Sequence, residues 1–105
     1  MSAAPSGLLR ALVARAGAPR DRILLTDVQS VDWQSLTFVG ERHVLHLRVA
    51  GEGSQTIVER VCRGIDDAEF NIPGQIVADI NVAGPPVRAS DGSTSLSIEA
   101  LTIAE

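Results

Sequence analysis

Apolar residues near the start of the chain recur at the spacing of one face of an α-helix. Residues 7–16 carry them at positions 8, 9, 12, 13 and 16, the period of a helix that packs one side on a core. Ser6 can cap the first turn with its hydroxyl, and Gly17, with Pro19 after it, can end the helix. We therefore predict a helix over residues 7–16.

A second stretch, residues 55–63, repeats this spacing with apolar side chains at positions 57, 58, 61 and 62. Ser54 is one candidate for the cap of its first turn; alternatively, Thr56 and Glu59 have the spacing of a capping box. Gly64 follows and can stop the helix in a left-handed conformation. The two predicted helices thus each offer one apolar face to a core.

The remaining apolar stretches are predicted to be strands; most alternate with a period of two, although the first has no cleanly apolar face. They are residues 23–31, 36–39, 42–49, 75–82 and 94–103. We expect Gly40 and Glu41 to form a type II′ turn that joins the second and third strands in a hairpin. The order α-β-β-β-α-β-β predicts one α+β domain over residues 1–105. It is a two-layer sandwich in which two helices cover one face of an antiparallel sheet of four to five strands.

The parity of the alternation predicts which strand residues face away from the core. In residues 75–82, Val77 and Asp79 have the parity opposite to that expected for the core. In residues 94–103 the apolar parity changes, which predicts a β-bulge near Glu99–Ala100. The face away from the helices is therefore expected to mix polar and apolar side chains.

Composition indicates a folded protein outside the membrane. Ile, Leu, Val and Phe make up 31 of the 105 residues, enough to bury a core. No apolar run approaches the roughly 20 residues of a membrane-spanning helix, so we expect no membrane association. The net charge of −4 and the pI of about 5.0 argue against a nucleic-acid-binding surface. The single cysteine excludes an intramolecular disulfide framework.

The first 20 residues contain three arginines and no acidic residue, a composition shared with organellar targeting segments. Because they also contain the apolar face of the first predicted helix, we favour a retained, folded helix and expect the protein in the cytoplasm. A free Cys62 agrees with a reducing compartment. The alternative of a targeting segment stays open.

The residues that most often carry chemistry do not form a recognisable catalytic set. His43 and His46 are three residues apart in a predicted strand, so their side chains point to opposite faces and do not chelate one metal ion. Cys62 lies on the apolar face of the second helix, where a thiol acts as a small hydrophobic side chain. No G-x-S-x-G or Walker motif is present. We therefore expect no catalytic residue, metal site or cofactor, and favour a non-enzymatic protein.

The leading hypothesis is a small module that associates with itself, as a homodimer, or with another protein through the uncovered sheet face. Residues 1–50 contain six arginines and four acidic residues, and residues 51–105 contain three arginines and nine acidic residues. The basic half of one copy can therefore attract the acidic half of another. The single tryptophan supports a binding role because this residue is enriched at interface hot spots. The predicted contact residues are Trp33, Val44, His46, Arg48, Val77 and Asp79.

The alternative hypothesis is a protein that binds a small molecule or a divalent metal ion, with a minor enzymatic activity as an extension. His46 and Asp79 are expected on one polar part of the sheet face. The acidic loop of residues 66–69 adds Asp66, Asp67 and Glu69, whose carboxylates suit calcium or magnesium. The spacing of an EF-hand loop is absent, so the signal from the acidic loop is weak.

Overall fold

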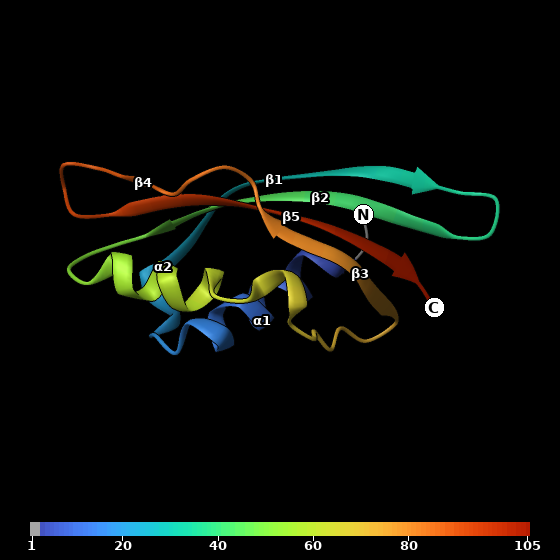
Figure 1. Cartoon of the computed structure of the whole chain (residues 1–105), viewed down its shortest axis with the longest axis horizontal. Helices are drawn as coiled ribbons and strands as arrows, with labels where there is room; N and C mark the ends of the chain where they lie inside the picture. Colours follow the sequence, from blue (N-terminus) through green and yellow to red (C-terminus); the bar gives the residue numbers. More distant parts are fainter. Residues whose placement is uncertain (1–2) are drawn as a thin grey trace.

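The chain folds into two layers, a sheet and a pair of helices that lie against one of its faces (Figure 1). The computed structural model describes residues 3–105. The predicted α+β class is confirmed, with five antiparallel strands and two helices, and helix, strands, helix and strands follow one another in the expected order. The elements are α1 (Ala4–Ala16), β1 (Ile23–Gln34), β2 (Val39–Val49), α2 (Ser54–Cys62), β3 (Gln75–Val82), β4 (Val87–Arg88) and β5 (Thr94–Ala104), with short 3-10 turns η1 (Arg20–Arg22) and η2 (Ile65–Asp67).

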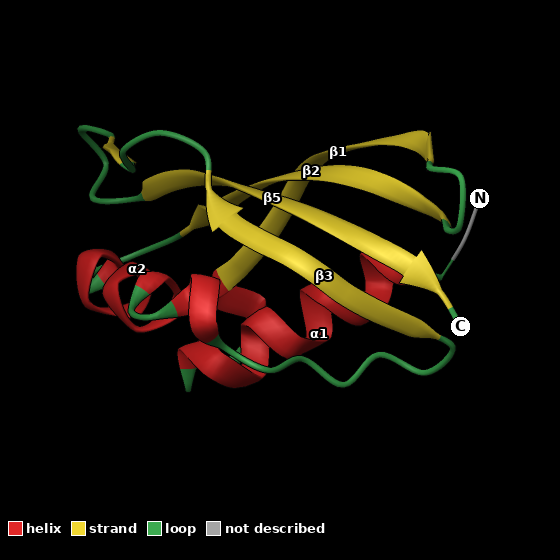
Figure 2. Cartoon of the chain, turned by 45° about the vertical axis from the view of Figure 1, so that its right-hand side comes forward, coloured by secondary structure: helices red, strands yellow, loops and turns green. Residues whose placement is uncertain are grey.

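The last strand, β5, lies inside the sheet. The strand order is β1-β2-β5-β3, and the short β4 pairs with the start of β5. The hairpin of β1 and β2 runs beyond the ends of the helices (Figure 1), and both helices stay on the same side of the sheet when the molecule is turned (Figure 2). The molecule is elongated as a result, with extents of 46 × 22 × 20 Å.

The turn between β1 and β2 lies at Ser35–Phe38, not at the predicted Gly40–Glu41. The Ser35 hydroxyl organises it by accepting hydrogen bonds from the N–H groups of Thr37 (3.3 Å) and Phe38 (3.0 Å). The N–H of Ser35 in turn donates to the carbonyl oxygen of Phe38 at 2.9 Å. The apolar residues of this turn therefore do not belong to a buried strand.

Gly40 lies inside β2 because of its neighbour across the sheet. A Cβ at this position would lie 2.1 Å from the carbonyl oxygen of Thr102 in β5, which is far inside contact distance. The glycine thus permits a close approach of two strands. The prediction of a separate strand over residues 36–39 is wrong, since β1 runs to Gln34 and β2 begins at Val39.

Each outer strand contains one extra residue, and this changes which side chains face the helices. The register shifts at Thr26 in β1 and at Ala78 in β3. The ladder between β2 and β5 runs without a shift, so the bulge predicted near Glu99–Ala100 is wrong. Beyond a bulge, the alternation continues on the opposite face.

The bulge at Ala78 corrects the predicted orientation of β3. Val77 pairs with the buried Thr102 and packs against the core. Ile76 pairs instead with Ile103 and is 52% exposed. The prediction that Val77 lies on the uncovered face is therefore wrong, because the extra residue reverses the parity before Asp79.

The core lies between the sheet and the helices. Its most deeply buried side chains are aliphatic and come from α1, α2, β2 and β5. They include Leu8, Leu12, Val61, Leu45, Leu47, Val49 and Ile98. Full burial of such a side chain stabilises the fold by about 1.5–3 kcal/mol. The sheet is thus fixed to the helices through one face only.

α1 begins earlier than predicted and ends as predicted. Its first turn contains Pro5, which suits that position, so Ser6 lies inside the helix and is not its cap. Gly17 ends the helix with a φ of 63°, the left-handed conformation that glycine adopts without strain. Arg15 in the last turn donates through Nε to the carbonyl oxygen of Val61 at 2.9 Å, which joins α1 to α2.

α2 also begins without a side-chain cap. Gly53, with a φ of 75°, precedes it, and neither Ser54 nor the Thr56 hydroxyl caps the first turn. The Ser54 hydroxyl donates instead to the carbonyl oxygen of Gly92 at 2.6 Å and lies 2.8 Å from the hydroxyl of Thr94. Ser54 therefore attaches α2 to the start of β5.

Candidate interaction surface on the uncovered sheet face

The face of the sheet away from the helices consists of rows of side chains that run across the strands. Residues paired across an antiparallel sheet carry their side chains on the same face, about 5 Å apart. At the hairpin end, one row contains Trp33, Gly40, Ile103 and Ile76, from β1, β2, β5 and β3. The side chains of this row are apolar apart from the indole N–H.

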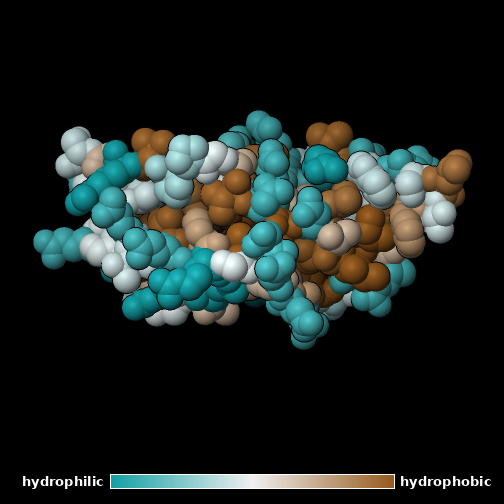
Figure 3. All heavy atoms as spheres, in the orientation of Figure 1, coloured by the Kyte–Doolittle hydropathy of each residue, from teal (hydrophilic) through white to brown (hydrophobic). Residues whose placement is uncertain are grey.

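This row opens into a hollow of about 270 Å³. Six residues line it and are called the apolar hollow below: Trp33, Phe38, Ile76, Ala78, Leu101 and Ile103. Phe38 is 53% exposed and Ile76 is 52% exposed, whereas Ile103 is 6% exposed, so water contacts only part of the lining. Hydrophobic side chains reach the surface at this end of the molecule, at the right in Figure 3, near β3.

Two charges of opposite sign border the apolar hollow. The next row contains Val31, Arg42, Leu101 and Asp79, which places Arg42 and Asp79 on opposite sides of Leu101. Both charged residues are exposed. Within residues 3–105, neither side chain makes an ion pair or a hydrogen bond. Each is therefore available to an opposite charge from another molecule.

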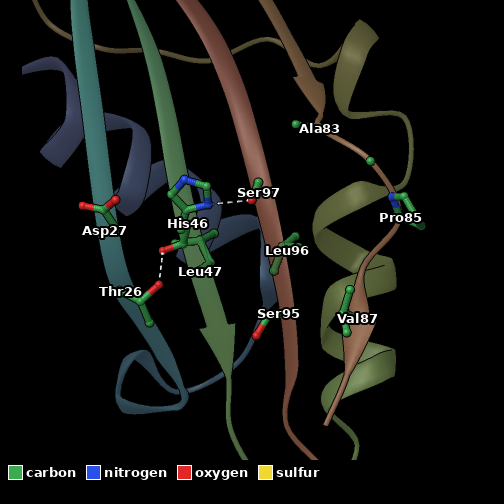
Figure 4. A pocket seen from close by; sticks show the side chains of 11 residues that line it. Thr26, Asp27, His46, Leu47, Ala83, Pro85, Val87, Ser95, Leu96 and Ser97 are labelled. Atoms are coloured by element: carbon green, nitrogen blue, oxygen red, sulfur yellow. Dashed lines mark hydrogen bonds between the residues drawn. The ribbon is translucent and has the colours of Figure 1, made fainter.

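A second hollow, called the His46 concavity below, lies nearer the other end of the sheet. His46 stands in one row with Asp27 of β1 and Ser97 of β5. Its Nδ1 lies 2.7 Å from the Ser97 hydroxyl, and the Thr26 hydroxyl donates to its carbonyl oxygen at 3.1 Å (Figure 4). The β3–β4 connection with Pro85 forms a further wall, and the concavity measures about 640 Å³.

Arg48 is engaged within its own chain. Its Nη2 pairs with a carboxylate oxygen of Asp91 at 2.5 Å, and its Nε donates to the Ser93 hydroxyl at 3.2 Å. The hydroxyl and the N–H of Ser93 donate to the Asp91 carboxylate, and these bonds, with a smaller contribution from Arg48, lower the pKa of Asp91 to about 2. Arg48 therefore holds the β4–β5 connection in place and is less available to a partner than Arg42.

The two histidines lie on opposite faces, as predicted. His43 is fully buried and faces the helix side, where burial lowers its pKa; the nearby carboxylate of Glu41 acts weakly in the opposite direction. Cys62 packs against the core, and burial raises the pKa of its thiol against the opposing effect of Arg15. A raised pKa disfavours the thiolate that a nucleophile needs.

Five of the six predicted contact residues lie on the uncovered face, but they are spread along it. These five are Trp33, Val44, His46, Arg48 and Asp79. Trp33 belongs to the apolar hollow and Asp79 borders it, whereas His46 belongs to the other hollow. The sixth residue, Val77, packs on the core.

The residues of the alternative hypothesis are dispersed. His46 pairs with Ser97 and Asp79 with Leu101, so two different rows hold them. The acidic loop of residues 66–69 follows α2 on the helix side of the sheet (Figure 1). In the part of the chain that the structure describes, no three His, Cys, Asp or Glu side chains form a group that could hold a metal ion.

Five of the six residues of the apolar hollow were not among the predicted contact residues: Phe38, Ile76, Ala78, Leu101 and Ile103. The signal for two of them was present, since the apolar parity of β5 changes after Ala100. The change does not reflect a bulge. It reflects an apolar core on one face and an apolar surface on the other.

The sequence matches no protein-family model and none of the curated proteins. Among residues 3–105, no helix is long and apolar enough to cross a membrane. Function is therefore inferred from the geometry of the uncovered face.

Proposed function

We propose that this protein is an interaction module that docks a protein on the hairpin end of its uncovered sheet face. The observation that carries the proposal is the apolar hollow at the hairpin end of the uncovered face, where Phe38 and Ile76 are each more than half exposed. Contiguous apolar surface of this kind usually marks an interaction site on a soluble domain. Its lining offers an occupant almost no hydrogen-bonding group, which favours an apolar protein surface over a polar small molecule.

The occupant that we propose is a second copy of the chain. The neighbouring turn adds to the apolar surface, since Leu36 is fully exposed. Removing such surface from water contributes about 25 cal/mol per Å². The exposed charges of both signs beside the apolar hollow suit a self-complementary contact, in which one surface meets its own copy.

Size is compatible with this proposal. A stable interface buries about 800 Å² on each partner. The molecule exposes 6311 Å² in total and is 46 Å long and about 20 Å wide, so one sheet face can supply an area of that order. The hairpin end and the rows next to it form only part of that face, which suits a weak, reversible dimer.

Sedimentation velocity over a range of concentrations tests the proposal. We expect the wild type to dimerise and Ile76→Asp to be monomeric, because the substitution places a charge in the apolar hollow. Val87→Asp is the matched control, since Val87 is an exposed strand residue (65%) at the other end of the sheet, and it should dimerise like the wild type. A wild type that stays monomeric, or equal dimerisation by the two variants, contradicts the proposal.

A second candidate function is binding of a small polar ligand in the His46 concavity. Its volume of about 640 Å³ lies in the range of small-molecule sites. The Ser97 hydroxyl orients the His46 ring through Nδ1, and the neighbouring Asp27 side chain has no ion pair among the described residues. A ligand with an amine or several hydroxyls would find both an anion and a hydrogen-bonding ring there.

Thermal denaturation in the presence of small amines, sugars and divalent metal ions tests this second function. A ligand that binds only the folded protein raises the melting temperature by mass action. We expect the rise to disappear in Ser97→Ala, which releases the His46 ring, and to persist in Ile76→Asp. The absence of any rise, or an equal rise in Ser97→Ala, contradicts binding in the His46 concavity.

A further inference from the structure

The charges beside the apolar hollow have a symmetry that specifies how two copies would meet. Arg42 of β2 and Asp79 of β3 both neighbour Leu101 of β5, one on each side. Neighbouring strands are about 4.8 Å apart, so each charge lies about one strand spacing from β5. A rotation of 180° about a line along β5 therefore exchanges the positions of the two charges.

We propose that two copies pack face to face about a two-fold axis that runs along β5 near Leu101, so that Arg42 of each copy pairs with Asp79 of the other. This inference rests on the proposed dimerisation and adds its geometry. The two ion pairs are equivalent by symmetry and lie on either side of an apolar centre. They also join the basic residues 1–50 of one copy to the acidic residues 51–105 of the other.

The same axis also matches the apolar row. Ile103 lies on β5, next to Leu101 on the same face, but it is only 6% exposed, so the exposed Ile76 beside it would make most of the contact of this row. Ile76, on one side of Ile103, would lie over the partner's Gly40 position, on the other side. Ile103 Cδ1 lies 3.1 Å from where a Cβ on Gly40 would be, so the exposed Ile76 side chain would pack on the partner's Ile103 beside Gly40.

The other two-fold axis in the plane of the interface is unfavourable. An axis at right angles to the strands through Leu101 places Arg42 over Arg42 and Asp79 over Asp79. It also sets the apolar row of Ile103 against the row of Glu99, which lies two residues away on the same face. Like charges in contact and apolar groups over a carboxylate both oppose such packing.

The proposed axis also predicts how Glu99 affects dimerisation. This residue lies on β5, as Leu101 does, and faces the same way, so the two copies of Glu99 approach each other across the axis. Their repulsion weakens the dimer. Glu99→Gln should therefore bind its own copy more tightly than the wild type does, by about threefold to tenfold.

Charge reversal tests the axis most directly. Arg42→Glu and Asp79→Arg each convert both intermolecular pairs into repulsions, so each variant alone should raise the dissociation constant at least about tenfold. A mixture of the two variants should form a heterodimer with nearly wild-type affinity, because both contacts again join opposite charges. An intramolecular pair would not be restored by mixing two chains.

Sedimentation velocity and native mass spectrometry of the single variants, their mixture and the double variant provide the measurement. Circular dichroism checks that each variant folds. Arg88→Glu carries the same charge change at the far end of the sheet, and it should dimerise like the wild type. If Ile76→Asp abolishes the dimer but the mixture does not recover, the axis is wrong and docking at the apolar hollow stands. A wild type that is monomeric at every concentration overturns both.

Discussion

At the scale of single residues, the most constrained side chain is that of His43. It is fully buried, and its two ring nitrogens have different partners on either side of β2. Nδ1 lies 2.7 Å from the hydroxyl of Ser30 in β1, and Nε2 lies 2.9 Å from the hydroxyl of Thr102 in β5. The ring thus links three strands, and burial holds its pKa below the ordinary value of 6.5.

This burial predicts that acid destabilises the fold through His43. In the unfolded chain the imidazole takes up a proton near pH 6.5, whereas in the folded protein it does so only at a lower pH. The unfolded state therefore binds more protons in this window, and the free energy of unfolding decreases as the pH falls from 6.5 to the lower pKa of the folded state. Urea unfolding at a series of pH values measures this slope.

His43→Gln should remove that contribution, because the amide can bond both hydroxyls but does not titrate. We expect the substitution to lower the free energy of unfolding by about 1–2 kcal/mol at neutral pH. The difference from the wild type should become smaller as the pH falls through this window. His46→Gln is the control, since it keeps the part of the slope that belongs to His43. Equal slopes for the wild type and His43→Gln would show that the buried ring does not govern the acid response.

Sequence could foresee part of this residue-level picture. The spacing of His43 and His46 within a strand places them on opposite faces, and this was correct. The hydroxyl partners of His43 were not foreseeable, because Ser30 and Thr102 are distant in sequence and meet only through the register of the sheet. Buried polar networks depend on such tertiary pairings.

At the scale of elements, the helices were predictable and the hairpin was not. The apolar period of a helix can be recognised in its own sequence. Which face of a strand is buried, by contrast, depends on the elements packed against it. The sequence Leu36–Val39 reads as a buried strand only if a core lies under it. In the molecule this segment projects beyond the helices, so its apolar residues are exposed.

The bulges explain the remaining errors at this scale. An extra residue at Thr26 or Ala78 leaves no local mark in the sequence, since it is defined by the partner strand. Period-two reasoning therefore assigned Val77 to the wrong face. In β5, which has no bulge, the same reasoning interpreted a real apolar surface as a bulge.

The contact between β2 and β5 at Gly40 gives a prediction at the element scale. Gly40→Ala should destabilise the fold by about 2 kcal/mol or more, because the new Cβ lies 2.1 Å from the carbonyl oxygen of Thr102 and the strands must separate. Val39→Thr, at the adjacent exposed position, should change the stability by no more than about 0.5 kcal/mol. Thermal or urea unfolding distinguishes the two; a stable Gly40→Ala would mean that the strands can separate at little cost.

At the scale of the whole molecule, the helix layer is shorter than the sheet that it covers. The α+β class and the one-sided helices could be predicted, because each follows from composition and period. The projection of the hairpin could not be predicted. It exists because β1 continues to Gln34 and the turn follows at Ser35–Phe38. The candidate site lies at that projection. The sequence therefore pointed to Trp33 but not to the residues at the centre of the apolar hollow.

Hydrogen exchange should distinguish the part of the sheet that the helices cover from the hairpin end that projects beyond them. We expect amides of Leu45 and Ile98, which lie over the helices, to exchange slowly at every protein concentration. Amides near Ile103 and Ile76 should become better protected as concentration rises in the wild type but not in Ile76→Asp. Mass spectrometry at two concentrations resolves these segments; protection gained near Val87 instead would place the contact at the other end of the sheet.

The position of the two extra residues limits how related sequences can differ in length. Each lies in a strand at the edge of the sheet, where only one neighbour must adapt to it. An insertion in β2 or β5 would have to be accommodated by strands on both sides and would turn the buried His43 or Ile98 outward. One-residue gaps in an alignment with a homologue should therefore fall around positions 26 and 78 and not in the two inner strands.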